Sequence, residues 1–489
     1  MKKSRRQFLE DSMFAAAAAV ATTAAGRLAA QEAQSPVAAG SATPNNKLSV
    51  AVIGVNGRGG DHLNGFLGLS NCEVTHICDP DSKVGNNRVE QVGQRQGRAP
   101  KWEADIRKLL EDPSIDIVSV ATPNHWHSLA AIWAIQAGKH VYVEKPVSHN
   151  VSEGRRVVEA ARKYNKICQT GTQSRSNPGM RQAIEFIQQG GIGTVNLARG
   201  LCYKRRGSIG PRGEYTPPAN VNYDLWLGPA PMAPLTRPNF HYDWHWQWPY
   251  GNGDLGNQGI HQMDIARWGL GLNQLSNSVL SYGGRFGYID AGDTANTQVV
   301  IFDYAPKTLV FEVRGLETKD FKGASVGVIF EGTDGYVVLP SYGGGAAFDK
   351  QGQMTKEFRG DSNHYENFVQ AVVAGDRKLL NADIEEGHLS SALCHLGNIS
   401  YRLGQACPTG EMIERLKAIP STDDAKATLE RTVEHLTENK VSTDETPFQL
   451  GQHLVLDPEH ESFRDNAQAN QMLTRDYRPP FIVPPAGQV

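Results

Sequence analysis

Three groups of residues, far apart in the chain, are of types that together can carry out hydride-transfer chemistry. Gly54, Gly57 and Gly59 form the segment Gly-Val-Asn-Gly-Arg-Gly, and Lys145 and His261 lie in two later motifs. Glycines at the start of a helix let backbone N–H groups bind a pyrophosphate. An ammonium group and an imidazole can stabilise and move the proton of a reacting hydroxyl group. These residue types indicate a dinucleotide-dependent reaction, provided that the fold brings them together.

The glycine segment departs from the strict pattern G-x-G-x-x-G. Asn56 stands where the second glycine is expected, and Gly57 follows it. Asn tolerates a positive φ better than most residues, so we expect the turn to form with little change. The segment follows the first predicted strand, and an acidic residue, Asp79, lies about 25 residues further on, which favours nucleotide binding.

Asp79 indicates which nucleotide is bound. A carboxylate at the end of the second strand can accept hydrogen bonds from the adenine ribose and would repel a 2′-phosphate, so we favour NAD over NADP. The alternative is a plain strand-end turn, because Asp79 begins the tripeptide Asp-Pro-Asp. The expected cofactor-binding residues are Gly54, Asn56, Gly57, Arg58, Gly59, Asp79, Thr122, Pro123, Asn124, His127, Glu144 and Lys145.

A parallel sheet is the element that must position these residues. Apolar runs at 48–53, 73–78, 115–121 and 140–143 alternate with helical patterns at 61–69, 84–94, 104–110 and 127–137. Such alternation predicts an α/β fold with a doubly wound parallel sheet of the Rossmann type. We place this NAD-binding domain at residues 48–168.

The second half of the chain has a different pattern. Strand-like segments at 195–203, 297–302, 308–313, 326–331 and 335–339 follow one another with few helices between them. They predict a C-terminal α+β domain, residues 169–404, with an open, largely antiparallel sheet. Residues 405–489 form a charged, finally proline-rich extension, which we expect to wrap over the surface or over a partner subunit.

The N-terminus has the features of an export signal. Ser4-Arg5-Arg6-Gln7-Phe8-Leu9 is a twin-arginine pattern, and a small-residue apolar run follows at 13–26. We predict a twin-arginine signal peptide at 1–30, a flexible linker at 31–47, and a periplasmic or otherwise exported protein without a stable membrane span after signal removal. An ordinary N-terminal helix is the alternative. Because this pathway carries folded proteins, we expect a tightly held, non-dissociating cofactor.

Charge and cysteine content argue against a nucleic-acid partner, a disulfide framework and a metal site. The net charge is −3 and no long basic stripe occurs, so we expect no nucleic-acid partner. The six cysteines are scattered and form no CxxC pair, so we expect free buried thiols, no disulfide framework and no metal site.

Four motifs occur in a characteristic order: the glycine segment, Ala-Thr-Pro-Asn-His-Trp-His, Gly-Lys-His-Val-Tyr-Val-Glu-Lys-Pro, and a glycine-rich turn that leads into His261. With them the chain resembles the glucose–fructose oxidoreductase/inositol dehydrogenase/rhizopine-catabolism (Gfo/Idh/MocA) oxidoreductase superfamily over most of residues 48–405. The resemblance implies that Lys145 lies beside the nicotinamide ring and the hydroxyl group that is oxidised. It also implies that residues 169–404 serve substrate binding and oligomerisation, and that the protein is a homo-oligomer, either a dimer or a tetramer.

One position departs from the pattern of that superfamily. Many members have Asp-x-x-x-His, with the His as general base, but here Asn257 takes the place of the Asp. Asn cannot accept a proton, so His261 would act alone or with Asp264 or Asp254, unless it is merely a hydrogen-bonded histidine at a helix start. The expected catalytic residues are Lys145, His261, Asn257 and Asp264.

The segment 241–250, His-Tyr-Asp-Trp-His-Trp-Gln-Trp-Pro-Tyr, is unusually aromatic. Aromatic rings can stack on the C–H faces of sugars, although such rings can equally fill a core or a subunit interface. His241 and His245 have metal-ligand spacing but no third ligand, and we expect no metal. The expected substrate-binding residues are Tyr203, His241, Trp244, His245 and Trp248, with Lys204 and Arg206 as further candidates.

Three functions follow from these observations. The first is NAD-dependent transfer of hydride to or from a sugar, sugar derivative or polyol. The second is a redox-neutral NAD-dependent glycosidase or epimerase that acts through a transient keto sugar. The third is a non-enzymatic NAD-binding sensor or scaffold, which the presence of both Lys145 and His261 disfavours.

Overall fold

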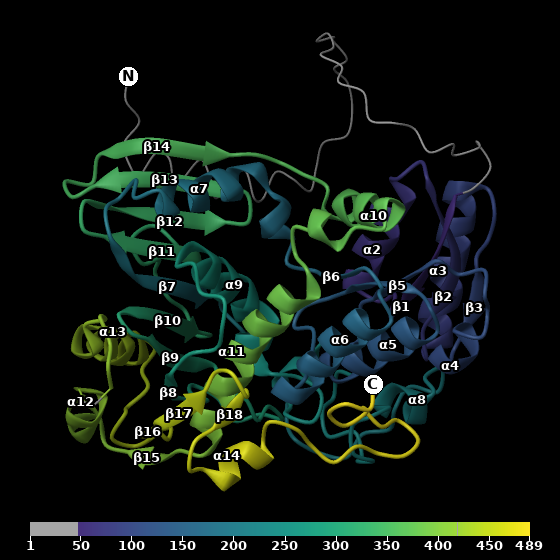
Figure 1. Cartoon of the computed structure of the whole chain (residues 1–489). Coiled ribbons are helices and arrows are strands. Elements are labelled where there is room, and N and C mark those ends of the chain that lie inside the picture. Colours follow the sequence, from purple (N-terminus) through teal and green to yellow (C-terminus); the bar gives the residue numbers. More distant parts are fainter. Residues whose placement is uncertain (1–46, 418) are drawn as a thin grey trace, which may run out of the picture.

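A computed structural model describes residues 47–417 and 419–489, which form two sheets with helices packed between them (Figure 1). The predicted signal peptide, residues 1–30, and all but the last residue of the predicted linker, 31–47, lie outside the described residues.

The first sheet is the predicted Rossmann sheet. Its six strands are all parallel and have the order β3-β2-β1-β4-β5-β6. Along β1, Ala51 and Ile53 join the apolar cluster on one face of the sheet, and Val50 and Val52 join the cluster on the other. Both faces are covered, which explains why the strands are continuously apolar. The strands are β1 (Leu48–Ile53), β2 (Cys72–Cys78), β3 (Lys101–Glu103), β4 (Ile117–Val120), β5 (His140–Val143) and β6 (Cys168–Thr170).

Helices cover the two faces of this sheet. The first, α2, begins at Arg58, inside the glycine segment and three residues before the predicted helix at 61–69, because Gly57 is its N-cap. Asp81 and Asn150 begin two later helices by accepting hydrogen bonds from backbone N–H groups of the first turn. The helices of this domain are α2 (Arg58–Leu67), α3 (Ser82–Gln96), α4 (Ile106–Leu109), α5 (Asn124–Gln136) and α6 (Val151–Lys163).

The second sheet has twelve strands and confirms the predicted open, largely antiparallel arrangement. Only β7 and β10 pair in parallel. The strands are β7 (Val195–Tyr203), β8 (Ser278–Gly284), β9 (Thr297–Tyr304), β10 (Lys307–Arg314), β11 (Val326–Gly332), β12 (Gly335–Ser341), β13 (Gly344–Asp349), β14 (Met354–Arg359), β15 (Gln405–Cys407), β16 (Phe448–Leu450), β17 (Leu454–Asp457) and β18 (Ser462–Phe463).

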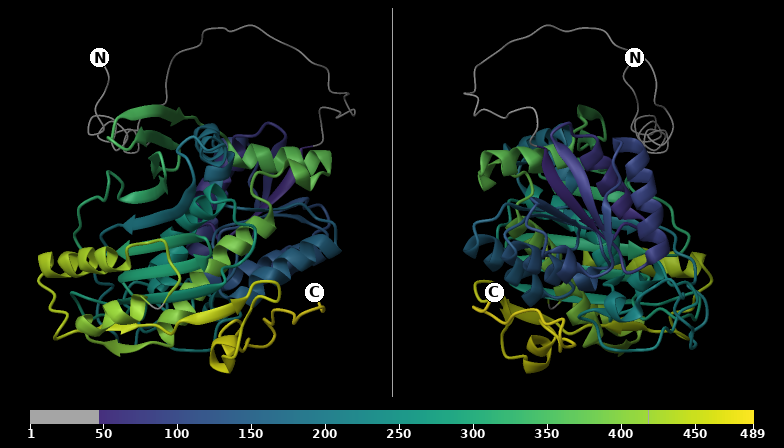
Figure 2. Two further views of the ribbon diagram at one scale, coloured as in Figure 1. Left: turned by 60° about the vertical axis from the view of Figure 1, so that its left-hand side comes forward. Right: turned by 90° about the vertical axis from the view of Figure 1, so that its right-hand side faces the viewer.

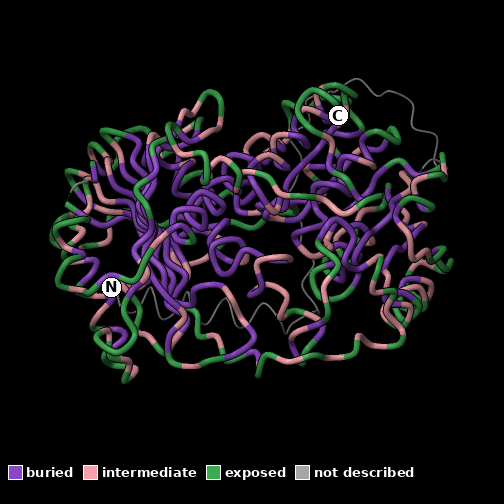
Figure 3. Tube along the Cα trace, turned by 90° about the horizontal axis from the view of Figure 1, so that it is seen from below, coloured by how far each residue is buried: buried purple, intermediate pink, exposed green. Residues whose placement is uncertain are grey.

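Helices α7 (Pro178–Gln188), α9 (Ile260–Gly269) and α11 (Ile384–Arg402) pack against the sheet, and α11 also contacts α6 of the Rossmann domain (Figure 1). A π-helical turn, η3 (Leu255–Gly259), leads directly into α9. Helix α10 (His364–Ala374) completes the core beside α2, and α8 (Tyr223–Leu227) lies in a long loop. Seen from below, buried backbone runs through both halves and the region between them (Figure 3).

The C-terminal extension is part of both domains. Its helices α12 (Thr409–Lys417) and α13 (Ala425–Glu438) pack on the sheet, and β15 to β17 extend the sheet edge. After β18 and α14 (Ala467–Gln471), the chain runs to the Rossmann domain, where Phe481, Val483 and Val489 join the core around α5 and α6 (Figures 1 and 2). The extension thus ties the two domains of its own chain together.

All six cysteines are buried and free, as predicted. No helix within the described part of the chain is long and apolar enough to cross a membrane.

Candidate active site

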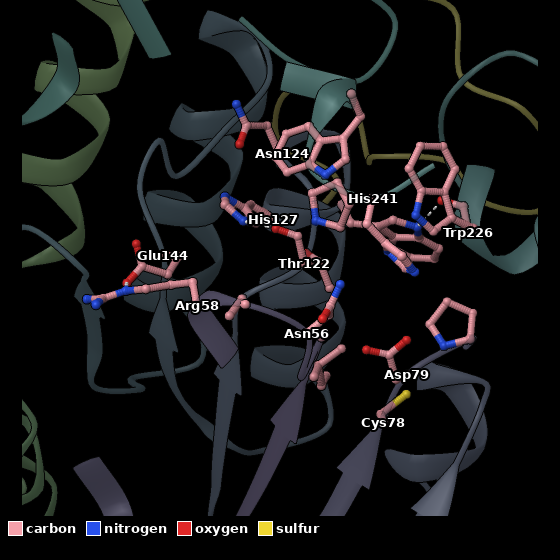
Figure 4. A pocket seen from close by; sticks show the side chains of 18 of the residues that line it. Asn56, Arg58, Cys78, Asp79, Thr122, Asn124, His127, Glu144, Trp226 and His241 are labelled. Atoms are coloured by element: carbon pink, nitrogen blue, oxygen red, sulfur yellow. Dashed lines mark hydrogen bonds and ion pairs between the residues drawn. The ribbon is translucent and has the colours of Figure 1, made fainter. Parts of the chain in front are cut away.

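The carboxyl ends of neighbouring parallel strands form the floor of a cavity of about 380 Å³. The order of the strands places Asp79, which follows β2, next to Gly54 after β1, then Thr122 after β4 and Glu144 and Lys145 after β5. Three steps of about 4.8 Å between strands separate Asp79 from Lys145. Figure 4 shows Asp79 and Glu144 on opposite sides of this cavity. Ligands of doubly wound sheets bind at this edge, where the strand order reverses between β1 and β4.

Each glycine of the segment has a separate physical role. Gly54 has a φ of +76°, and a Cβ there would lie 2.8 Å from the Ala121 carbonyl oxygen. A Cβ on Gly59 would lie 1.9 Å from the Gly54 oxygen, so Gly59 lets α2 pack against the turn. Gly57 has a φ of +54°, and a Cβ there would meet no atom within 4 Å. The positive φ therefore falls on Gly57 and not on Asn56, which corrects our explanation of how the departure is tolerated.

The start of α2 is suited to a phosphate. Gly57 caps the helix without any side-chain hydrogen bond, so N–H groups of the first turn have no side-chain acceptor at the cavity. Thr122, also on the cavity wall, has a buried Oγ1 without a hydrogen-bond partner. The N–H groups of Gly59 and Gly60 already bond to the backbone carbonyl oxygens of Asn56 and Gly57. The positive end of the α2 dipole and the unpartnered Thr122 Oγ1 together fit a dinucleotide with its pyrophosphate at α2.

Asp79 is buried and held in a fixed orientation. Its two carboxylate oxygens accept hydrogen bonds from the backbone N–H groups of Val55 and Asp81, each at 2.9 Å. Burial raises the pKa of Asp79 to about 6, although these two hydrogen bonds oppose the shift. Each oxygen keeps a lone pair for a ribose hydroxyl group.

This pKa predicts how NAD binding depends on pH. If NAD binds the ionised Asp79, protonation competes with binding, so the affinity should fall by up to about tenfold per pH unit as the pH decreases below about 6. Asp79→Asn removes the titrating group and should flatten this profile between pH 5 and 8, at an overall weaker affinity. Titration of NAD binding by calorimetry at several pH values measures it. An unchanged slope in Asp79→Asn would contradict the assignment.

His127 connects the loops that follow β4 and β5. Its Nδ1 lies 2.6 Å from the carbonyl oxygen of Pro146, and its Nε2 lies 2.7 Å from that of Thr122. Burial lowers the pKa of His127. The residue next to Lys145 is thereby fixed relative to the cavity wall, so His127 positions the loop that carries Lys145.

Glu144 lines the cavity and holds Arg58 in place. Its Oε1 accepts a hydrogen bond from Arg58 Nε at 2.7 Å (Figure 4) and lies 3.1 Å from His62 Nε2. Burial alone would raise the pKa of Glu144, but Arg58 and His62 hold it well below its ordinary value. A permanently ionised Glu144 therefore anchors Arg58 at the start of α2.

Lys145 lies at the end of the cavity where the nicotinamide ring is expected. Its Nζ donates a 2.7 Å hydrogen bond to the backbone carbonyl oxygen of Asn257. Burial, reinforced by the charge of Arg58 and opposed by Glu144, lowers the pKa of Lys145. Asn257 thus contacts Lys145 through its main chain, a contact that does not depend on the Asn side chain.

His261 is buried next to this site. Its ring packs against that of Tyr342 with centroids 4.9 Å apart, and its Nδ1 has no hydrogen-bond partner. Burial and then the charge of Lys145 hold the pKa of His261 well below its ordinary value, so the ring is neutral. Asp264, by contrast, accepts hydrogen bonds from Arg175 and Ser390, and Asp254 pairs with Arg206 at 2.7 Å. Neither carboxylate bonds to His261.

The aromatic segment forms the roof of the cavity. His241, Trp244 and His245 line it, and His241 Nε2 lies 3.0 Å from Asp81 Oδ2. The ring of His245 stacks on Trp244 with centroids 3.6 Å apart. Burial lowers the pKa of His245 to about 3, with Lys145 among the further causes. His245 is therefore a second neutral imidazole near Lys145.

Two expected substrate residues lie elsewhere. Gly200 faces α9, because a Cβ there would lie 3.1 Å from Gln262 Cβ. Side chains alternate along a strand, so Tyr203 points to the opposite face, where it donates a 2.6 Å hydrogen bond to Glu312. Trp248 lines a separate cavity.

Sequence reasoning missed several contributors. Trp226 of α8 lines the cavity, and its carbonyl oxygen accepts a 3.0 Å hydrogen bond from Trp126 Nε1. His62 supports Glu144 from below. The aromatic content of residues 211–249 could have indicated Trp226, but no local pattern indicates His62. In residues 47–417 and 419–489, no group of three or more His, Cys, Asp or Glu side chains is arranged to hold a metal ion.

Two models of one oxidoreductase family match the chain. The model described as an NAD-binding Rossmann fold matches residues 48–172, and the model described as a C-terminal alpha/beta domain matches residues 210–418. Together they cover more than half of the chain.

Two curated relatives resemble part of the sequence. A levoglucosan dehydrogenase of Pseudarthrobacter phenanthrenivorans is 30% identical over 179 residues, which are 36% of this chain and 39% of the relative. A glycosyl hydrolase family 109 protein of Shewanella pealeana is 29% identical over 204 residues, 40% of this chain and 45% of the relative. The match therefore spans less than half the length of either relative.

Solved structures share the fold. The WlbA dehydrogenase of Bordetella pertussis, in complex with NADH and UDP-GlcNAcA, has a TM-score of 0.55 at 19% identity, covering 73% of this chain and 97% of that one. GenD2 from gentamicin A biosynthesis, in complex with NAD, has a TM-score of 0.53 at 20% identity, covering 74% of this chain and 96% of that one.

Proposed function

Because the chain belongs to the Gfo/Idh/MocA oxidoreductase family, we propose that it oxidises or reduces a carbinol carbon of a sugar, sugar derivative or polyol with NAD. The observation that carries the proposal is the position of Lys145 in the cavity, three strands from the ribose-binding candidate Asp79. This separation leaves room for a dinucleotide with its adenosine end at Asp79 and its nicotinamide end at Lys145.

Lys145 suits the chemistry of a hydroxyl group. When bound, NAD supplies a hydride acceptor at C4 of its nicotinamide ring. Lys145 Nζ, held by the Asn257 carbonyl oxygen, donates a hydrogen bond to the substrate oxygen and stabilises the charge that develops there. Because burial lowers its pKa, Lys145 loses its own proton more easily than an exposed lysine does, and in the amine form the same nitrogen can take the hydroxyl proton.

Two neutral imidazoles can pass that proton on. The pKa values of His261 and His245 are both lowered by burial, so each ring has a nitrogen lone pair at neutral pH. His245 lines the cavity, whereas His261 does not line it and packs against Tyr342. Asn257 cannot serve as the carboxylate of a relay, and neither Asp264 nor Asp254 bonds to His261, so we assign the proton to Lys145 with His261 or His245.

The long loop of residues 211–249, which contains α8, supports tight cofactor binding. Backbone hydrogen bonds join Ser82 to Asn220 and Asn222 to Pro80, so the loop is attached to the rim of the Rossmann domain. The C-terminal segment holds the loop from outside, because Arg478 donates hydrogen bonds to Asp224 and Gly228. Moving this loop away from the cavity would break several hydrogen bonds at once. We therefore propose that NAD remains bound through many turnovers.

A redox-neutral reaction is the second candidate. The same loop favours this reaction, because NAD that stays bound must return to its oxidised form without leaving the site. Oxidation of a glycoside to a keto sugar would pass hydride to NAD and acidify the neighbouring C–H bond, so that elimination could release the aglycone. Addition of water to the resulting enone would form the new C–O bond at the anomeric carbon, and return of the hydride to the keto carbon would restore NAD. The glycosyl hydrolase family 109 relative is consistent with this route.

One set of assays distinguishes the functions. Native and denaturing mass spectrometry of the purified protein should show a co-purifying NAD. Levoglucosan and a panel of sugars and inositols are then tested for formation of NADH, and aryl glycosides for release of the aryl alcohol. Net NADH supports the first function, and aryl release without NADH supports the second. Binding of NAD without turnover of any substrate would support a non-enzymatic sensor and would contradict both enzymatic functions.

We further propose that the protein is exported by the twin-arginine pathway and forms a homo-oligomer. Fractionation of cells and light scattering of the purified protein test these two statements. Replacing Arg5 and Arg6 with Lys should retain the protein in the cytoplasm if the signal is of the twin-arginine type.

A further inference from the structure

A second cavity, of about 390 Å³, lies outside the candidate active site. It forms where the start of α6, the segment around Trp248, helix α11 and the C-terminal segment after α14 meet. Its residues come from parts of the chain more than 200 residues apart, and none of them lines the first cavity. Asn252 separates the two sites, since its Oδ1 accepts a 3.1 Å hydrogen bond from Asn124.

Two arginines supply unused donors to this cavity. Arg402 forms no hydrogen bond or ion pair with any residue that the structure describes, and its guanidinium lies 5.0 Å from the ring centroid of Trp248. Arg475 donates to the Pro249 carbonyl oxygen at 2.9 Å, whereas its Nη2 is buried without an acceptor. Arg475 Nε forms an ion pair with the buried carboxylate of Glu153 at 3.7 Å, a distance too long for a hydrogen bond, so the Nε–H donor remains unused although the charge of Arg475 has a partner. Planar guanidinium groups with free N–H donors suit an oxyanion.

The remaining lining groups suit hydroxyl groups and a sugar ring. Asn398, which is 5% exposed, donates to the Asn252 carbonyl oxygen at 2.9 Å, but its Oδ1 has no partner. His395 is buried and His149 is half-buried, and desolvation lowers the pKa of both, so both rings are neutral. The indole of Trp248 offers an apolar face of the kind that packs on sugar C–H groups. Asp476, at the rim, pairs with neither arginine within the described residues.

We propose that this cavity binds an acidic saccharide, whose carboxylate contacts Arg402 and Arg475 and whose hydroxyl groups contact Asn398. The site is separate from the NAD cavity and is formed only when the C-terminal segment is in place. It does not depend on the reaction assigned to the first cavity, so either assignment can fail without the other.

Calorimetric titration with D-glucuronate tests the proposal, with D-glucose and sulfate as comparison ligands. The full chain with its bound cofactor should bind glucuronate saturably and at least about tenfold more tightly than glucose or sulfate. Arg402→Gln and Arg475→Gln should each weaken that binding by about tenfold or more. The matched control is Arg415→Gln, an exposed arginine of α12 that pairs with Glu411 and does not line the cavity, and this variant should leave glucuronate binding unchanged. Lys145→Met should also leave glucuronate binding unchanged.

Other outcomes overturn the proposal. Equal binding of glucose would exclude an anion-specific site, and equal binding of sulfate would exclude a saccharide site. Glucuronate binding that survives in Arg402→Gln, or that is lost in Lys145→Met, would place the ligand elsewhere. Since Arg402 lies on the surface, its variant remains informative even if Arg475→Gln fails to fold.

Discussion

Replacing Lys145 with Met is expected to lower kcat by about 10²- to 10⁴-fold while NAD stays bound. Met fills nearly the same volume but can neither stabilise a developing alkoxide nor accept a proton. The hydrogen bond to the Asn257 carbonyl oxygen is lost as well, but the loop after β5 keeps its attachments through His127 and Ser128. Steady-state kinetics with the best substrate of the panel measures the loss, and mass spectrometry confirms the retained cofactor.

Lys139→Met is the matched control for this prediction. Lys139 is also a buried lysine of the Rossmann domain, its Nζ donates a 2.9 Å hydrogen bond to the Asp112 carbonyl oxygen, and burial lowers its pKa. It does not line the cavity. Its replacement should lower the melting temperature without lowering kcat. Equal activity losses in the two variants, or full activity of Lys145→Met, would remove Lys145 from the reaction.

Replacing Gly57 with Ala is expected to weaken NAD binding by at least about 100-fold. The backbone at Gly57 has a φ of +54° and a ψ of −116°, a conformation that residues with a Cβ avoid at a cost of about 1–3 kcal/mol. The added methyl group would meet no protein atom, but it would stand at the start of α2, where the pyrophosphate is expected. Calorimetry with NAD measures the affinity.

The variant Gly138→Ala distinguishes backbone strain at a positive φ from obstruction of the pyrophosphate by the added methyl group. Gly138 also has a positive φ, +82°, and a Cβ added there would meet no atom within 4 Å, but it lies between α5 and β5, at the opposite end of the strand from the cavity. This variant should lose stability of a similar order and bind NAD normally. If both variants bind NAD equally well, the pyrophosphate does not lie at Gly57.

The local chemistry of the Rossmann domain could be predicted from the sequence because it depends on short-range patterns. The apolar runs of β1 and β4, each ended by glycine or by a polar turn, fixed where the strands end. Parallel strands in this order bring Gly54, Asp79 and Lys145 to one edge, so three residues distant in sequence could be assigned to one cavity. The family resemblance added the role of Lys145, which no periodicity indicates.

Positions in the second domain could not be predicted in the same way. Tyr203 ends a strand that is buried on both faces, so its apolar pattern does not show which face the tyrosine occupies. Trp248 and Trp244 lie in one aromatic segment, yet a short turn at η2 (Asp243–Trp246) sends them to different cavities. Asp264 has a helical spacing compatible with the site, but Arg175, from a distant segment, binds it.

The sequence by itself determined the parallel sheet, the nucleotide-binding edge and the lysine beside it, because these depend on strand periodicity, on glycine geometry and on motif order. Only the tertiary structure decided which imidazoles are neutral, which carboxylates are already paired, and that the last 85 residues join both domains. Burial and ion pairing arise from side chains far apart along the chain, so they are properties of the packed molecule and leave no local pattern in the sequence.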